Sequence, residues 1–184
     1  LDAGKLGLMI WNVYLEFQNT TEKEELEIIS YLCKHQRTWW VACCSGKWNL
    51  IYSLCVKTVK EFYHIVNEVN SLYGKYILNQ SIAAHAEVEI ISRGYFLQKA
   101  GIGTTWYKTV ETSPLDDEDL KILSVMAQHA RMPSTEIAKL TNLTTRVVAY
   151  RLKKIKALGI INRFRLQLDV KKIEHTSTSE VYGT

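Results

Sequence analysis

The chain has 184 residues, a formal net charge of +4 at neutral pH and an apolar fraction of 47%. This length allows one large domain or two small ones, and the composition is typical of an ordinary globular protein. No apolar run approaches the roughly 18 residues that a membrane span needs. Residues 1–17 also lack the basic start and small-residue cleavage site of a signal peptide. We therefore predict a cytoplasmic protein.

Positive charge gathers toward the C-terminal part of the chain. Residues 1–97 carry nine Lys and Arg against ten Asp and Glu, whereas the remaining residues carry 14 against nine. The excess is densest from Arg146 to Lys172, where nine basic residues oppose Asp169 alone. Such a cluster predicts a polyanion as partner. The alternative is a helix face that is merely solvated.

The cysteines do not have the spacing of a metal site. Cys33, Cys43, Cys44 and Cys55 contain no C-x-x-C pair, and two of them are adjacent. We expect reduced thiols that pack as small hydrophobic groups, and we predict no metal and no cofactor.

Residues 1–97 alternate between strand and helix patterns in the order β-α-β-β-α-β. Strands are expected at 8–18, 39–44, 48–56 and 76–92, and helices at 21–35 and 59–73. Thr21 and Glu24 form a capping box at the start of the first helix, whose apolar residues are Leu26, Ile29, Leu32 and Cys33. This order predicts a ferredoxin-like domain in which both helices cover one face of the sheet. The other face is free to pair with a partner, and aromatic residues such as Trp39 and Trp40 suit a subunit interface.

Residues 98–114 hold two glycines and a proline, and we interpret them as an extended linker with a possible hairpin at 100–104. Residues 115–174 then predict three short helices followed by a strand at 160–168, and residues 175–184 form a tail. The fold class is therefore α+β, with a ferredoxin-like domain followed by a winged helix-turn-helix.

Several residues define the three short helices. Asp116 and Asp119 cap the first, whose expected apolar stripe is Leu120, Leu123 and Met126. Pro133 opens the second, in which Ile137, Ala138 and Leu140 are expected to face inward. Asn142 suits a left-handed turn, Thr144 caps the third helix, and Gly159 ends it.

The third helix is basic, and its outer face predicts contacts with double-stranded DNA. The candidate DNA-binding residues are Thr144, Thr145, Arg146, Ala149, Tyr150, Lys153 and Lys154. Arg146 can read a guanine edge, while the lysines suit phosphate contacts. Arg151 is expected to pair with DNA or, alternatively, with the acidic first helix. For every one of these residues the alternative is simple solvation.

These motifs resemble the Lrp/AsnC (feast/famine) regulators of bacteria and archaea. The resemblance lies in Leu115-Asp116-x-x-Asp119-x-Lys121-Ile122-Leu123, in Glu136-Ile137-Ala138, and in Arg151-Leu152-Lys153-x-Ile155 before Gly159. Residues 1–97 resemble the family's sensing domain, called RAM, and Gly46-Lys47-Trp48-Asn49 resembles its Gly-x-aromatic-Asp hairpin. The family implies transcriptional regulation, homodimers that assemble further, and an amino acid or other small effector near Gly46, Trp48 and Asn49.

The chain departs from the family in two ways. Asn49 stands where the family has Asp, so the anionic partner for an effector's ammonium group is missing. The DNA-binding domain also follows the sensing domain, whereas the family places it first. Leu1-Asp2-Ala3-Gly4-Lys5-Leu6 is similar to Leu168-Asp169-Val170-Lys171-Lys172-Ile173. We hypothesise a piece of a longer tandem protein, or a chain that lost one DNA-binding domain.

Three functions follow from these observations. The first is a sequence-specific DNA-binding regulator that dimerises through the sheet domain. The second is an enzyme similar to tetrapyrrole decarboxylases, which the sequence disfavours because the strands flanking Gly46 carry only Lys47 as a charged residue. The third is a module whose winged helix binds protein. We predict the first and expect no enzymatic activity.

Overall fold

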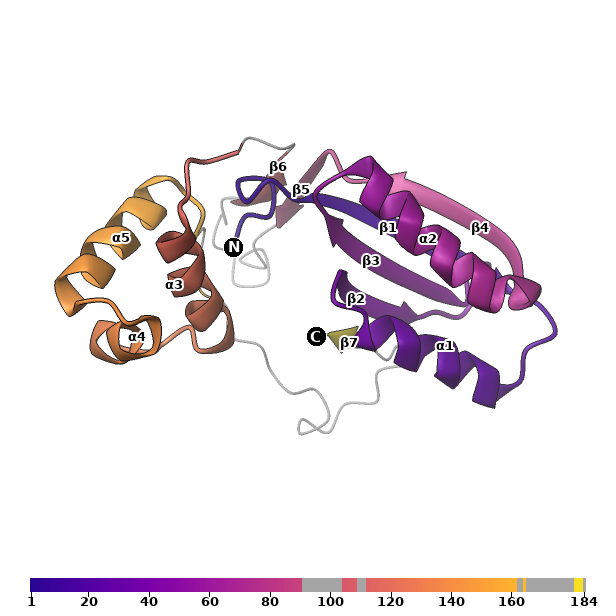
Figure 1. Cartoon of the computed structure of the whole chain (residues 1–184). Coiled ribbons are helices and arrows are strands. Elements are labelled where there is room, and N and C mark those ends of the chain that lie inside the picture. Colours follow the sequence, from indigo (N-terminus) through magenta and orange to yellow (C-terminus); the bar gives the residue numbers. More distant parts are fainter. Residues whose placement is uncertain (91–103, 109–111, 162–163, 165–180, 184) are drawn as a thin grey trace, which may run out of the picture. The chain divides into compact units, whose positions relative to one another are not determined.

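The computed structural model describes residues 1–90, 104–108, 112–161, 164 and 181–183. The chain divides into two compact units (Figure 1). The sheet unit comprises Leu8–Val88 and the described part of Leu168–Thr184, and the helical unit comprises Leu1–Gly7 with the described part of Glu89–Gln167.

The sheet unit has the predicted ferredoxin-like topology. Its strands are β1 (Met9–Phe17), β2 (Thr38–Cys43), β3 (Leu50–Val56) and β4 (Ile77–Ala84), in the order β4-β1-β3-β2 with antiparallel neighbours. Helices α1 (Glu22–Lys34) and α2 (Val59–Tyr73) lie on the same face of this sheet (Figure 1). The α+β fold class predicted from the sequence is therefore confirmed.

The helix α1 begins where the sequence predicted, because a capping box fixes its first turn. Thr21 and Glu24 form the capping box, and the hydroxyl of Tyr76 donates to the Glu24 carboxylate at 2.7 Å. This hydrogen bond and two from Thr21 lower the pKa of Glu24 to about 2, so the carboxylate stays charged. Tyr76 closes the short 3₁₀ helix η1 (Gly74–Tyr76) after α2, so the bond ties the start of α1 to the segment that follows α2.

The core of the sheet unit lies between the sheet and its two helices. All four apolar residues expected on one face of α2 are buried, namely Phe62, Ile65, Val66 and Val69. In α1 the prediction was wrong for Leu26, which is 53% exposed, while Ile28 and Leu32 point inward. Leu26 lies about 200° around the helix from Ile28, on the solvent side.

Two segments differ from the predicted strands. The strand expected at 76–92 breaks after Ala84, and β5 (Glu87–Ile90) pairs with β6 (Thr104–Lys108) in a separate two-stranded sheet. Residues 104–108 of the expected linker thus form a strand. Within the expected tail, β7 (Val181–Gly183) pairs with the edge of β2, with Val41 opposite Tyr182.

The thiols behave as packed groups. Burial raises the pKa of Cys33, and it raises the pKa of Cys55 to about 11, so both remain protonated at neutral pH. In the described ranges, no three potential metal-ligating side chains gather in one place. None of the helices that the structure describes has the length and apolarity that a membrane crossing requires.

The helix α1 offers a matched test of this core. Leu32→Ala removes a fully buried side chain and should lower the free energy of unfolding of the sheet unit by about 2–5 kcal/mol. Leu26→Ala, the same change on the exposed side of α1, should cost less than about 0.5 kcal/mol. Urea unfolding followed by tryptophan fluorescence measures both, and equal losses would contradict the packing described above.

Candidate nucleic-acid interface

Three short helices form the helical unit's core. They are α3 (Asp117–Gln128), α4 (Ser134–Thr141) and α5 (Thr145–Ala157). One apolar cluster joins all three helices, and its buried members are Ile122, Ile137, Ala138 and Val148. A second cluster joins α3, the end of α5 and the residues after it, and its buried members are Leu123, Ile155 and Ile160. The sequence predicted a strand at 160–168. Its first two residues, Ile160 and Ile161, are not in a strand, and most of the others lie outside the described residues.

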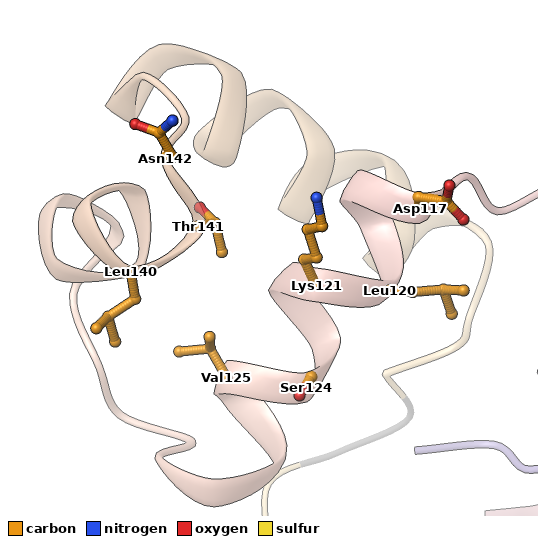
Figure 2. A pocket seen from close by; sticks show the side chains of 8 residues that line it. All are labelled: Asp117, Leu120, Lys121, Ser124, Val125, Leu140, Thr141 and Asn142. Carbon is orange, nitrogen blue, oxygen red and sulfur yellow. The ribbon is translucent and has the colours of Figure 1, made fainter.

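Two leucines expected in this core are instead on the surface. Leu120 is 49% exposed and Leu140 is 64% exposed, so the inward prediction was wrong for both. They line a shallow hollow between α3 and α4 together with Val125 and Thr141 (Figure 2). Ile122 and Leu123 take the inward positions of α3 because their side of the helix faces α4 and α5.

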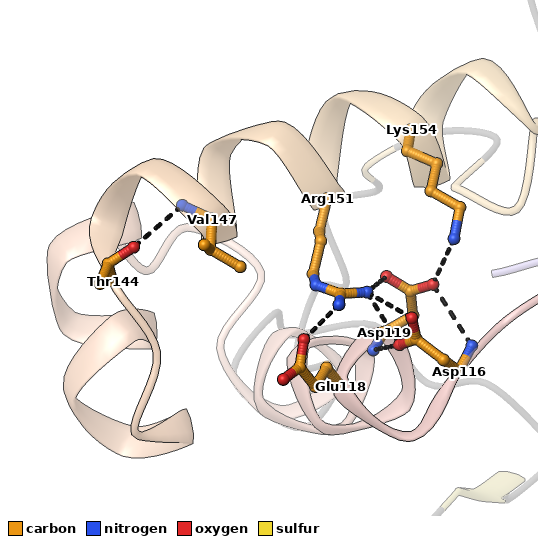
Figure 3. A network of polar contacts seen from close by, with 7 residues as sticks. All are labelled: Asp116, Glu118, Asp119, Thr144, Val147, Arg151 and Lys154. Atoms are coloured by element: carbon orange, nitrogen blue, oxygen red, sulfur yellow. Dashed lines mark hydrogen bonds and ion pairs between the residues drawn. The ribbon is translucent and has the colours of Figure 1, made fainter.

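The turn between α4 and α5 has the predicted geometry. Asn142 adopts the left-handed conformation with φ 56° and ψ 38°, which an Asn tolerates better than most residues. The hydroxyl of Thr144 then accepts a hydrogen bond from the backbone N–H of Val147 at 3.3 Å and caps α5 (Figure 3). At the other end Gly159 has φ +69°, a conformation that favours glycine. The start and end of α5 are thus as predicted.

Six of the seven candidate DNA-binding residues are exposed on α5 or at its cap. These are Thr144, Thr145, Arg146, Ala149, Tyr150 and Lys153. Tyr150 is the most exposed large aromatic residue among the described residues, at 71%. Exposing the apolar ring of Tyr150 to water is unfavourable, and the side chains around it are basic or carry hydroxyl groups. This face therefore suits a polar partner that also offers a flat or apolar surface.

Lys154, the seventh candidate, is engaged within the unit. Its ammonium pairs with the carboxylate of Asp119 at 2.7 Å, and Asp119 is fully buried (Figure 3). The position of Lys154 follows from helix geometry, since it lies three residues after Arg151 and shares its face. Binding of Lys154 to a phosphate would compete with this ion pair.

Arg151 stands at the centre of the same cluster, which also includes Asp116, Glu118, Asp119 and Lys154. Its guanidinium contacts Asp116 at 2.7 Å and Asp119 at 2.9 Å, and it also pairs with Glu118. The predicted alternative for Arg151, a salt bridge to the acidic first helix, is therefore the one observed. We call these five residues the α3–α5 ion cluster.

The contacts within the ion cluster shift the pKa values of Asp116, Asp119 and Arg151. Hydrogen bonds from Arg151 and from the Asp119 backbone lower the pKa of Asp116. Burial alone would raise the pKa of Asp119, but hydrogen bonds from Lys154, Arg151 and Asp116 outweigh it, and the pKa is lowered. The same contacts raise the pKa of Arg151. Asp116, Asp119 and Arg151 therefore stay charged at neutral pH, and α5 is clamped to α3.

The clamp divides the basic residues of α5 into two sets. Arg151 and Lys154 neutralise the acids of α3, whereas Arg146, Lys153 and Lys156 lie exposed. Lys156 additionally lies 5.9 Å above the ring of Phe164. The outer face thus keeps a positive charge that the neighbouring carboxylates do not cancel.

The predicted effector hairpin lies in the sheet unit. Gly46 occupies the exposed turn with φ +129°, and Trp48 packs 5.8 Å from Tyr14 and 5.0 Å from the ammonium of Lys47. The side-chain oxygen of Asn49 accepts the backbone N–H of Phe17 at 2.8 Å. With its oxygen engaged in the fold, Asn49 offers a ligand its amide N–H₂ group, which donates.

Comparison with known proteins identifies the three helices. The AsnC-type helix-turn-helix domain matches residues 115–156. An uncharacterized HTH-type transcriptional regulator of Pyrococcus abyssi is 34% identical over 32% of this chain and 40% of its own length. The HTH-type transcriptional regulator LysM of Sulfurisphaera tokodaii is 35% identical over 31% of this chain and 41% of its own length. The chain thus matches less than half the length of these relatives.

A solved structure is similar over a longer part of the chain. The siroheme decarboxylase NirDL superposes with a TM-score of 0.57 over 86% of this chain and 45% of that protein, at 14% identity. At this identity the likeness shows the arrangement of the fold and nothing about activity. The matches at residues 115–156, by contrast, confirm the resemblance to the Lrp/AsnC regulators.

Asp119 provides the test of the ion cluster. Asp119→Asn leaves Arg151 and Lys154 without a buried anionic partner and should destabilise the helical unit by about 2 kcal/mol. Asp117→Asn removes an exposed charge two residues earlier in α3 and should cost less than about 0.5 kcal/mol. Hydrogen exchange of α3 and α5 at rising urea concentration measures the difference, and equal stability of the two variants would refute the clamp.

The lowered pKa values of Asp116 and Asp119 also predict a dependence on acid. Their charged forms stabilise the folded unit above the ordinary carboxyl pKa of 3.8, and this contribution is lost as the pH falls through the lower folded-state values. The melting temperature of the helical unit should therefore drop below about pH 4. The double variant Asp116→Asn/Asp119→Asn should show a flatter profile, and an unchanged slope would contradict the assignment.

Proposed function

Because residues 115–156 form an AsnC-type helix-turn-helix domain, we propose that this chain is part of a sequence-specific DNA-binding transcriptional regulator. The observation that carries the proposal is the outer face of α5, where Arg146, Tyr150 and Lys153 are exposed beside two threonines. The α3–α5 ion cluster supports it, because it uses other basic residues to hold the helix and leaves this face available.

The residues of α5 have distinct roles in this proposal. The N-terminal turns of a recognition helix reach base edges in the major groove, so Arg146 reads a guanine through its O6 and N7 atoms. Thr144 and Thr145 contact phosphate or a thymine methyl group, and Tyr150 donates its hydroxyl to a phosphate. Lys153 neutralises the backbone. Lys154 contributes mainly through Asp119, and its contact with DNA is secondary.

The sheet unit supplies assembly and sensing in the proposed regulator. A homodimer formed through the sheet presents two recognition helices to a pseudo-palindromic site. A small effector at Gly46, Trp48 and Asn49 would alter this assembly. The Asn49 oxygen accepts the backbone N–H of Phe17, so only its amide N–H₂ group is available to an effector. The effector group at this point is therefore an acceptor such as a carboxylate, and the ammonium of Lys47 also favours a negative charge.

Regulation is a better proposal than catalysis for this chain. The relatives that share 34–35% identity with the helix-turn-helix are transcriptional regulators. The decarboxylase likeness rests on 14% identity and extends to the fold alone. An acidic protein partner for α5 is the remaining alternative, and the DNA-binding experiment below separates it from the first proposal.

Duplexes selected from a random library, and scrambled versions of them, test the proposal by fluorescence anisotropy. The logarithm of the association constant should fall linearly with the logarithm of the salt concentration, since phosphate contacts release counterions. Arg146→Ala should cost about 1–3 kcal/mol on the selected duplex and little on the scrambled one. Lys153→Ala should weaken both alike and reduce the salt slope by about 1.

Lys121→Ala is the matched control for these variants. Lys121 is an exposed lysine on α3 beside the hollow shown in Figure 2, so its removal changes the net charge by the same amount as Lys153→Ala. Its effect on the affinity should be small. Equal effects of Lys121→Ala and Lys153→Ala, or binding that ignores salt, would rule out α5 as the recognition helix.

A further inference from the structure

The first seven residues of the chain belong to the helical unit, although the sheet unit begins at the very next residue. This segment, Leu1–Gly7, is folded on itself. The side chain of Asp2 is buried and accepts the backbone N–H groups of Gly4 at 3.0 Å and Lys5 at 3.3 Å. The N–H of Gly7 donates to the carbonyl of Gly4 at 2.9 Å. We call this folded segment the strap.

Three hydrogen bonds fasten the strap to the helical unit. The N–H of Asp2 donates to the carbonyl of Ile160 at 2.8 Å, and the N–H of Ser113, ahead of α3, donates to the carbonyl of Lys5 at 3.0 Å. The ammonium of Lys5 donates to the carbonyl of Leu158 at 2.6 Å. Leu6 adds an apolar contact with the cluster of Leu123, Ile155 and Ile160.

The bond from Lys5 meets α5 at its C-terminal cap. Leu158 is the C-cap of α5, where carbonyl groups lack partners within the helix and the helix dipole is negative. A positive side chain is favoured at this position. Gly159 provides the necessary room, because a Cβ atom there would lie 2.7 Å from the Lys5 ammonium. The cap therefore matches a cation that comes from outside the helix.

We propose that the strap sets the position of the C-terminal end of α5, with Lys5 as a positioning residue for DNA recognition. The inference rests on the proposed function of α5. The ion cluster clamps the helix through Arg151 and Lys154, and the strap holds it at Leu158, so two separate attachments fix its axis. Lys153 lies about 7.5 Å along the helix from Leu158, whereas Arg146 is more than twice as far. Loss of the strap therefore disturbs the phosphate contact more than the base contact.

Lys5→Met tests this proposal, because methionine keeps an unbranched apolar stem but cannot donate to Leu158. The full chain with Lys5→Met should bind selected and scrambled duplexes about three- to five-fold more weakly, with its discrimination between them retained. Lys5→Arg, which can still donate to the carbonyl, should restore the affinity. Lys60→Met, an exposed lysine on α2, is the control for net charge and should leave the affinity unchanged.

Hydrogen exchange provides a readout that does not need DNA. Exchange at Leu158, Gly159 and Ile160 should accelerate in Lys5→Met and stay at the wild-type rate in Lys5→Arg and Lys60→Met. Unchanged exchange in Lys5→Met, or faster exchange with unchanged affinity, would overturn the positioning role. In the Lys153→Ala background, a further reduction of the salt slope by about 1 on Lys5→Met would instead make Lys5 a direct phosphate contact and would also overturn the positioning role. A wild-type chain that binds no duplex would defeat the proposed function, while the exchange rates would still decide whether the strap holds α5.

Discussion

The helical unit depends on one buried carboxylate. Asp119 is fully buried, yet it remains charged because the cations of Arg151 and Lys154 reach it at 2.9 and 2.7 Å. An unpaired charge in that position would be too costly to bury, so the pairing forces α5 to present one particular face to α3. The same pairing therefore fixes the orientation of the opposite face of α5, which carries Arg146 and Lys153. A buried ion pair adds little net stability, but breaking it is costly, so this pairing favours one arrangement of α5 on α3.

Local sequence signals predicted the ends of the helices well, because capping is decided within four residues. Thr21 with Glu24, Asp116 with Asp119, and Asn142 with Thr144 all adopt the expected roles. The prediction was wrong for Leu26, Leu120 and Leu140, because an apolar side chain alone does not determine which of two helix faces packs against the core. The break after Ala84 was missed because it depends on pairing between β5 and β6, which are distant in sequence.

The candidate site was predictable to a similar degree and for the same reasons. The exposed positions of α5 follow from its helical period, and so does the shared face of Arg151 and Lys154. The sequence predicted a phosphate contact for Lys154, however, and did not predict its ion pair with Asp119. Lys5 and Leu158 are separated by most of the chain, so no local sequence pattern predicts their contact. One signal was present: Asp2 and Lys5, which make the strap's polar contacts, recur as Asp169 and Lys172 in the repeated pattern. The described structure does not extend to that second copy.

The strap is joined covalently to the sheet unit and by a hydrogen bond to the C-cap of α5. Leu8 follows Gly7 at once and β1 begins at Met9, so Leu8 alone separates the strap from the first strand of the sheet. The hairpin with Asn49 is tied to that same strand, because its side chain accepts the N–H of Phe17 and its backbone N–H donates to Leu15. A side chain at position 49 that could not accept from Phe17 would therefore leave the end of β1 without this hydrogen bond.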